Sequence, residues 1–243
     1  MQNQLTKDLD YLSLPFLKTE IFNMMEDAVQ KGTTLVEFFP MAINLEAMEK
    51  HQRANQRRVS QARFPQQKTL ESFDWGHPEK IKEELVRYLF SLHFIEKKKN
   101  IAFLGLPGLG KTHLMTALGL HACSSGYSVL YETAANIINR LQAAQADETF
   151  MRALKRYMKV DILCIDEIGY LPIDQQGANL LFQVISSRYE TGSIILTSNK
   201  AFKDWNEIFN DSTITSAILD RLLHHCEVIT IEGKSYRMMS RNK

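Results

Sequence analysis

The run Gly105-Leu106-Pro107-Gly108-Leu109-Gly110-Lys111-Thr112 constrains the fold more than any other part of this chain. It has the form G-x-x-x-x-G-K-T and lies between an apolar segment that suits a buried strand, 100–104, and a segment with helical apolar spacing, 113–123. A glycine-rich turn in this context points its backbone N–H groups at phosphate oxygens, helped by the positive end of the helix. We therefore predict a phosphate-binding loop, in which Lys111 contacts the β- and γ-phosphates and the hydroxyl of Thr112 binds Mg²⁺.

A second signal is the apolar run 162–165, which is followed directly by Asp166 and Glu167. Such a run is typical of a strand buried on both faces of a parallel sheet. Ligands of open α/β sheets bind at the carboxyl ends of the strands, where both carboxylates would lie. We expect Asp166 to hold Mg²⁺ beside Thr112 and Glu167 to orient or deprotonate an attacking water.

Two further polar residues complete the expected site. Asn199 directly follows the predicted strand 193–198, level with the acidic pair, so that its amide can hydrogen-bond a γ-phosphate or the water. An ordinary turn asparagine is the alternative. Arg221, in a predicted helix over 214–223, is a candidate arginine finger that stabilises charge on the transferred phosphoryl group, often from another subunit. An exposed structural arginine is the alternative.

Charge and cysteine content exclude several classes of protein. The net charge is +1, so that any surface for nucleic acid must be local. The three cysteines, Cys123, Cys164 and Cys226, form no C-x-x-C pair, which argues against a disulfide framework and against a zinc site. The adjacent His224 and His225 are expected to point to different sides of a helix, and we interpret neither as a metal ligand. Without a signal pattern or a membrane-length apolar run, we expect a cytoplasmic protein that does not contact membranes.

Residues 1–62 are predicted to form a small helical module. A helix over 16–31 should stop at Gly32, and a second helix starting at Leu35 should be kinked or shortened by Pro40. The stretch 45–64 is polar nearly all round and has more basic than acidic residues. It is either a solvated connector or a surface for nucleic acid or a partner protein.

A linker over 63–78 is expected to join this module to a third region, 79–243, that carries the phosphate-binding motifs. Its aromatic residues Phe73 and Trp75 either stack on an adenine or anchor the linker in a core. One amphipathic helix is predicted over 79–97. A further helical piece over 147–158 carries three basic residues that either touch DNA phosphates or form a solvated face, namely Arg152, Lys155 and Arg156.

Five predicted strands alternate with helices, and the motifs follow one another as phosphate loop, strand-end Asp-Glu, strand-end Asn and then Arg. This order resembles that of the AAA+ ATPases, in the clade of bacterial initiators and helicase loaders. Within the clade the chain is similar to the IstB type, the helper ATPases of insertion-sequence transposition. The stretches that carry the resemblance are 63–75, Gly105–Thr112, Ile165–Tyr170, Thr197–Asn199, Leu219–Leu222 and Gly233–Arg237.

The resemblance implies an α/β fold, with an AAA+ core around a five-stranded parallel sheet and a helical N-terminal module. The sequence departs from the broad AAA+ pattern in one respect, since we expect no C-terminal lid domain. It implies ATP and Mg²⁺ as cofactors, and ATP hydrolysis stimulated by DNA. It further implies a homo-oligomer that depends on ATP and duplex DNA, and a transposase docked on the N-terminal module. At the residue level it implies nucleotide binding by 105–112 with His113 and Arg237, the latter as second sensor. Asn199 would sense the γ-phosphate, and Arg221 would act on a neighbouring subunit's nucleotide.

Three other functions remain open from the sequence. A replicative helicase loader of the DnaC type would share the ATPase core and differ in the partner of residues 1–62. A small-molecule P-loop kinase would need a pocket for an acceptor substrate and would not need Arg221 at a subunit interface. A clamp that binds ATP without hydrolysing it is disfavoured by Glu167.

Overall fold

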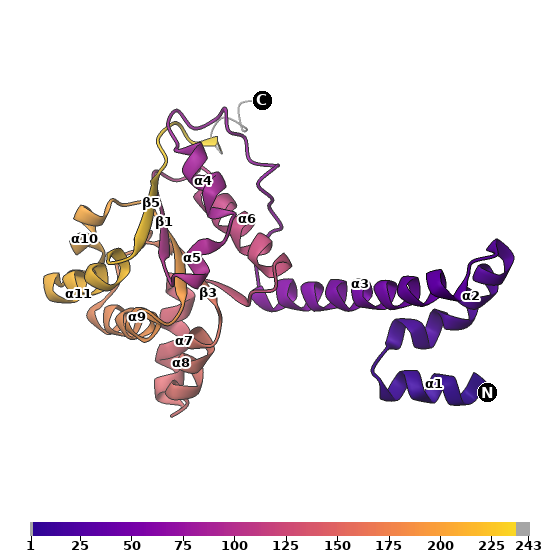
Figure 1. Ribbon diagram of the computed structural model, residues 1–243. Helices are drawn as coiled ribbons and strands as arrows, with labels where there is room; N and C mark the ends of the chain where they lie inside the picture. Colours follow the sequence, from indigo (N-terminus) through magenta and orange to yellow (C-terminus); the bar gives the residue numbers. More distant parts are fainter. Residues whose placement is uncertain (1, 237–243) are drawn as a thin grey trace. The chain divides into compact units, whose positions relative to one another are not determined.

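The computed structural model describes residues 2–236 of the chain (Figure 1). The chain divides into two compact units, Met1–Arg57 and Arg58–Lys243. The domain limits drawn from the sequence, at 62 and 78, stay predictions. None of the helices in the described part of the chain is long and apolar enough to cross a membrane.

The larger unit is built on one parallel sheet, as the sequence predicted. The strand order is β2-β3-β4-β1-β5, and every neighbouring pair is parallel. Because all strands run the same way, the phosphate-loop segment after β1 and the acidic pair of β3 reach the same edge of the sheet. The strands are β1 (Asn100–Leu104), β2 (Val129–Thr133), β3 (Ile162–Ile168), β4 (Ser193–Ser198) and β5 (Cys226–Thr230).

Helices cover both faces of this sheet (Figure 1). Successive side chains of β1 alternate between the two cores: Ile101 and Phe103 pack on one face, Ala102 and Leu104 on the other. The first face is covered by α4 (Glu83–Leu89), α5 (His93–Glu96) and α6 (Lys111–Ser124). The second face is covered by α7 (Ala134–Ala146), α8 (Phe150–Met158), α9 (Gln175–Arg188), η1 (Phe202–Asp204), α10 (Asn206–Phe209) and α11 (Ser212–Leu223).

The prediction of a single helix over 79–97 is wrong. Two short helices, α4 and α5, stand in its place, and Leu92 between them has a left-handed φ of 61°. Leu92 is buried in the core. Lys80 instead pairs with Glu232 through two backbone hydrogen bonds of 3.2 and 3.0 Å. Tertiary packing and this bridge therefore override a helical apolar pattern that is locally consistent.

The smaller unit contains α1 (Gln2–Tyr11), α2 (Pro15–Lys31) and the first part of α3 (Leu35–Ala62). Gly32, with a φ of 68°, ends α2 as predicted, because a left-handed residue stops a helix. Shortening of the next helix at Pro40 was wrong, since α3 continues through Pro40 to Ala62.

The core of the smaller unit is small. Its buried apolar side chains are Leu9, Leu17, Ile21 and Ala42. The buried carboxylate of Glu46 accepts a hydrogen bond of 2.8 Å from the backbone N–H of Leu17, which satisfies a donor at the start of α2. Several large apolar side chains of the same unit stay more than two thirds exposed, namely Val29, Leu35, Val36 and Phe39.

Candidate active site

Asp166 is the centre of a polar cluster at the carboxyl edge of the sheet. Its side chain is buried, and the Thr112 hydroxyl lies 3.1 Å from each of its carboxylate oxygens. The Tyr131 hydroxyl donates to Oδ2 at 2.7 Å, and the Thr197 hydroxyl hydrogen-bonds Oδ1. Burial, followed by the hydrogen bond to Asp166, raises the pKa of Tyr131, so that this hydroxyl keeps its proton and donates a hydrogen bond to the carboxylate. Three strands and the first turn of α6 thus fix one carboxylate.

The backbone of Glu167 departs from the regular conformation of β3. It has a φ of 61°, and the pairing of β3 with β4 shifts register between Ile165 and Ile168. The Thr197 hydroxyl accepts the Glu167 backbone N–H at 3.0 Å and so holds this irregularity in place. Because the bulge rotates the residue, Glu167 is exposed within a strand that is otherwise buried. Its carboxylate is therefore accessible to water.

The phosphate loop closes on itself through Lys111. The Lys111 ammonium donates to the carbonyl oxygens of Gly105 and Leu106 at 2.6 and 2.8 Å, and the side chain is only 9% exposed. Gly105 has a φ of 152°, and a Cβ there would lie 2.2 Å from the Ile231 carbonyl oxygen, so no other residue fits. Helix α6 begins at Lys111, directly after the loop, so the positive end of the helix lies at the loop.

A cavity of about 550 Å³ opens beside the loop. The residues from Gly108 to His113 line it together with Tyr131, Asp166 and Glu167, and the linker lines its other side. This volume lies in the range that holds a cofactor-sized ligand. Of the predicted nucleotide-binding residues, Gly105, Leu106 and Pro107 lie outside this lining, and the side chains of Leu106 and Pro107 are exposed.

The linker is anchored on the first turn of α6. His113 Nε2 lies 2.8 Å from the Thr69 carbonyl oxygen, and the buried ring of Phe73 packs edge-on against His113 and Trp75 at centroid distances of 5.3 and 4.8 Å. A Cβ at Gly110 would lie 2.6 Å from the Phe73 ring. These contacts support the core-anchor interpretation of Phe73 and Trp75.

The segment after β5 lies on the phosphate loop. The Tyr236 backbone N–H donates to the Gly108 carbonyl oxygen at 3.0 Å, and a Cβ at Gly108 would lie 2.2 Å from Ser235 Oγ. Tyr236 also lines the cavity, where its ring meets His77 edge-on at 4.8 Å. Arg237, the predicted second sensor, lies outside the described residues.

Sequence reasoning missed Tyr131, Thr197 and Tyr236 as site residues. Tyr131 and Thr197 lie near the carboxyl ends of β2 and β4, the strands on either side of β3. That position in a parallel sheet was the available signal for both. For Tyr236 the available signal was its place in Gly233–Arg237, one of the stretches that carry the family resemblance.

Asn199 and Arg221 do not line the cavity. Asn199 Oδ1 is buried and has no hydrogen-bond partner among the described residues, so that it can accept a bond from a ligand or water. The Arg221 guanidinium lies 4.8 Å from the centre of the Phe182 ring and donates to the Ala217 carbonyl oxygen at 3.0 Å. Arg221 therefore contacts its own helix and α9 in this structure.

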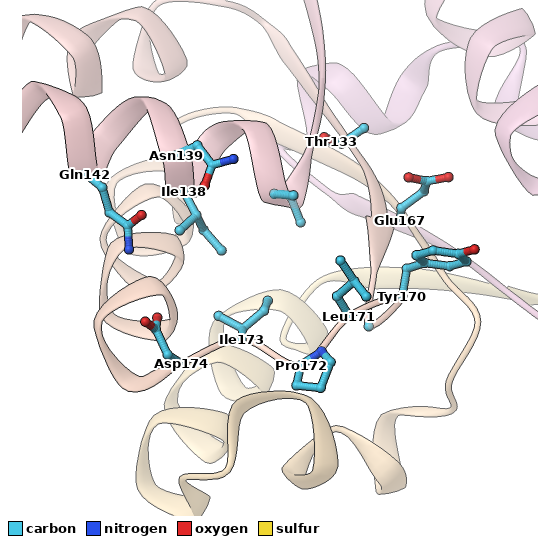
Figure 2. Close-up of a pocket in the computed structure, with 13 residues that line it drawn as sticks. Thr133, Ile138, Asn139, Gln142, Glu167, Tyr170, Leu171, Pro172, Ile173 and Asp174 are labelled. Carbon is cyan, nitrogen blue, oxygen red and sulfur yellow. The ribbon is translucent and has the colours of Figure 1, made fainter.

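A second cavity, of about 340 Å³, lies on the other side of Glu167. Figure 2 shows Glu167 and Tyr170 at one end of it and Gln142 of α7 at the other. Tyr170 and Leu171 are both more than 60% exposed. Glu167 thus lines both the cavity beside the phosphate loop and a second cavity whose lining includes the exposed side chains of Tyr170 and Leu171.

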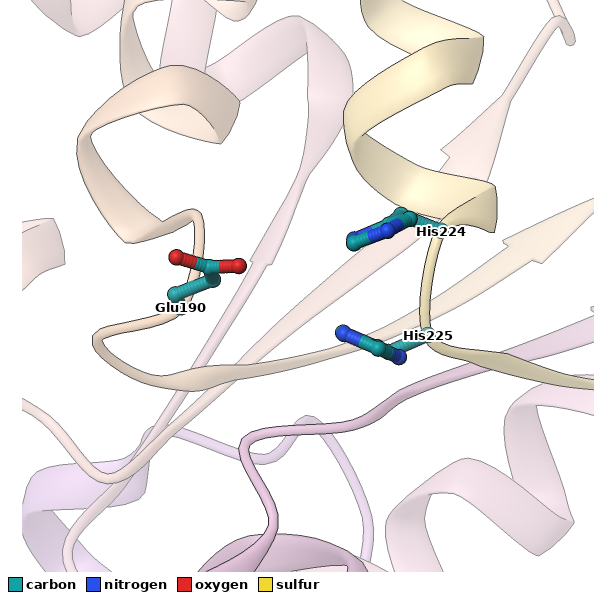
Figure 3. Close-up of side chains that lie close together, drawn as sticks. All are labelled: Glu190, His224 and His225. Carbon is teal, nitrogen blue, oxygen red and sulfur yellow. The ribbon is translucent and has the colours of Figure 1, made fainter.

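The expected divergence of His224 and His225 is wrong. Helix α11 ends at Leu223, and the two imidazole rings lie 4.1 Å apart, on the same side of the chain (Figure 3). The divergence rule for adjacent residues applies inside a helix, whereas His224 caps the end of α11 and His225 lies beyond it.

Comparison with known proteins places these features in one family. The family model described as IstB-like ATP binding protein matches residues 7–243. A Pseudomonas aeruginosa protein, named as an ATP-binding protein of insertion sequence IS21, is 41% identical over 97% of this chain and 89% of its own.

Two solved structures show the same fold. AMPPCP-bound DnaA from Aquifex aeolicus is 23% identical, with a TM-score of 0.59 over 70% of this chain and 51% of its own. The DnaC helicase loader is 21% identical, with a TM-score of 0.52 over 68% of this chain and 96% of its own. The larger unit therefore has the AAA+ P-loop fold, and the chain belongs to the IstB-like ATP-binding protein family.

Proposed function

We propose that this chain binds ATP with Mg²⁺, hydrolyses it on duplex DNA, and acts with a transposase in the choice of a target site. The observation that carries the proposal is the convergence of Thr112, Asp166 and Glu167 beside the phosphate loop. Hydroxyl and carboxylate oxygens are the ligands that Mg²⁺ prefers, so these residues fit the ion. Bound Mg²⁺ would neutralise charge on the phosphate oxygens.

Contacts in and near the cavity support a role for each of three residues. Lys111 lines the cavity, and its ammonium, now held by two loop carbonyl oxygens, would bind the β- and γ-phosphates. Glu167 would take a proton from the attacking water, because its exposed carboxylate is not engaged by the cluster around Asp166. Asn199 would accept a hydrogen bond from that water through its amide oxygen, which lacks a partner among the described residues, or donate one to the γ-phosphate through its amide NH₂.

Tyr131 is expected to tune the metal site without binding nucleotide directly. Tyr131→Phe removes the hydrogen bond to Asp166 Oδ2 and leaves the ring in place. Partners that orient a metal ligand typically contribute 10- to 100-fold in affinity, so the Mg²⁺ concentration for half-maximal turnover should rise at least ~10-fold. Magnesium titrations of ATP hydrolysis measure this. Tyr127→Phe changes a tyrosine outside the cavity and should leave the Mg²⁺ requirement unchanged, whereas equal curves for wild type and Tyr131→Phe would remove Tyr131 from the metal site.

Two features support the DNA and transposase partners. Arg58, Arg63 and Arg156 line one surface pocket of the larger unit, although α8 is far from α3 in sequence. None of the three forms an ion pair within the described part of the chain. Guanidinium groups that form no ion pair suit a phosphate backbone, and Arg58 still has free donors besides the Nε that bonds the Cys123 carbonyl oxygen at 2.8 Å. The exposed apolar side chains of the smaller unit suit a protein partner.

Replacing two of these arginines should weaken DNA binding in a salt-dependent way. Each phosphate contact adds about 0.9 to the slope of log affinity against log salt concentration, so Arg63→Gln with Arg156→Gln should lower the slope by about 2. Fluorescence anisotropy with labelled duplex DNA, ATP and a salt series measures the slope. Lys82→Gln, an exposed basic residue on another surface, is the matched control. An unchanged slope in the double variant would exclude this pocket as a phosphate contact.

The function itself is tested by ATP hydrolysis and particle mass, each with and without duplex DNA. We expect DNA and ATP together to drive assembly and to raise turnover. A monomer that ignores DNA would contradict the proposal and favour a small-molecule kinase, while assembly without turnover would favour a clamp. A helicase loader is distinguished by a pull-down of the full chain with a transposase and with a replicative helicase, in which we expect only the transposase to bind.

A further inference from the structure

Glu190, His224 and His225 form a cluster of potential metal ligands outside the nucleotide site. One donor atom from each side chain lies within 4.8 Å of the other two. Figure 3 shows both imidazoles projecting from the end of α11 toward the Glu190 carboxylate. All three side chains are exposed, so an ion could reach them without any opening of the fold.

The backbone on both sides of the cluster is fixed. Glu190 lies in the turn between α9 and β4 with a left-handed φ of 59°. The His225 carbonyl oxygen accepts the Asn100 backbone N–H at 2.7 Å, which ties this residue to the first residue of β1. The donors therefore come from two separate segments, the turn before β4 and the end of α11 before β5.

Tyr189 provides a second contact of the kind found around metal-bound histidines. Its hydroxyl lies 2.8 Å from His224 Nδ1. When Nδ1–H donates to this hydroxyl, Nε2 keeps its lone pair and can bind an ion. Metal-bound histidines commonly use their other ring nitrogen in this way, which fixes the tautomer and the orientation of the ring.

We propose that Glu190, His224 and His225 bind a divalent transition-metal ion of the Zn²⁺ class. Two imidazoles and one carboxylate form a ligand set that suits Zn²⁺ and leaves a fourth position for water. Mg²⁺ prefers oxygen ligands, so this site would not compete for the ion expected at Thr112 and Asp166. A bound ion would join the turn after α9 to the end of α11, the helix that carries Arg221.

The test is a competition titration of the full chain, stripped with EDTA and free of nucleotide, with Zn²⁺ against a chromophoric chelator. We expect one saturable site. Glu190→Gln and His225→Gln each remove one ligand from a different segment and should weaken binding at least ~100-fold, more than the 10- to 100-fold typical of outer contacts. Tyr189→Phe keeps all three ligands and removes the outer contacts of this hydroxyl to His224 and Glu190, so it should weaken binding about 10-fold.

Two controls separate this site from other ligands. His93→Gln changes an exposed histidine that also lies beside a tyrosine, and Cys226→Ser changes the thiol next to His225; both variants should bind Zn²⁺ as wild type does. Zn²⁺ should raise the melting temperature of wild type and not that of Glu190→Gln. Equal Zn²⁺ affinity of wild type, Glu190→Gln and His225→Gln, or the absence of saturable binding in wild type, would overturn the proposal.

Discussion

Replacing Glu167 with glutamine is expected to leave ATP binding intact and to lower turnover at least ~100-fold, the scale of a general base. The reason is that two adjacent carboxylates differ in their surroundings. Asp166 is buried and engaged by three hydroxyl groups, whereas Glu167 is exposed through the bulge in β3. The amide of glutamine keeps the size of the side chain and cannot accept a proton from water. Single-turnover hydrolysis and binding of a fluorescent ATP analogue measure the two effects separately.

Glu84→Gln is the matched control, because Glu84 is an exposed glutamate on α4 that does not line either cavity beside Glu167. Its turnover should equal that of wild type. If Glu167→Gln hydrolyses ATP at the wild-type rate, Glu167 has no part in the mechanism. If it loses ATP binding as well, the residue supports the cavity and the general-base role fails in favour of a structural one.

Much of the fold could be predicted because its signals are local. Three strands of the sheet, β1, β3 and β4, contain short apolar runs, and the phosphate loop lies between β1 and a helix, so these parts could be located without tertiary information. The pairing of Thr112 with Asp166 followed from one rule, that parallel strands end at the same edge of a sheet. The sequence pattern was therefore sufficient for the motifs whose residues are brought together by topology alone.

The remaining features depend on contacts that no local pattern records. Leu92 breaks a helical pattern because its side chain is buried in a left-handed conformation. Tyr131 reaches Asp166 only because β2 is the neighbour of β3 in this sheet. His224 and His225 face one direction because α11 ends at Leu223, directly before them. In each case the outcome depends on where an element ends or on which element lies beside it.

Arg221→Ala is expected to spare nucleotide binding by the monomer and to lower DNA-stimulated hydrolysis at least ~1,000-fold, the lower scale of an arginine finger. Arg221 does not line the cavity of its own chain, and its guanidinium lies on Phe182 of α9. A role in hydrolysis therefore requires that it act on the nucleotide of a neighbouring subunit. Phe182→Leu removes the ring beneath Arg221 and keeps the guanidinium, so it should stay within a few-fold of wild type, since an aromatic–cation contact of this kind contributes about 1 kcal/mol.

Mixing two inactive variants distinguishes action in trans from action in cis. In a head-to-tail assembly of Arg221→Ala and Glu167→Gln subunits, an Arg221→Ala subunit supplies Glu167 while its Glu167→Gln neighbour supplies the arginine. Random mixing in equal amounts would restore up to about a quarter of the sites. We therefore expect DNA-stimulated turnover to reappear on mixing, although each variant alone is inactive. Absence of recovery, with both variants still assembling on DNA, would contradict the role in trans. Equal losses of activity in Arg221→Ala and Phe182→Leu would instead assign Arg221 to the packing of α11 on α9. The contact between Arg221 and the Phe182 ring is what both variants lose, and it is structural.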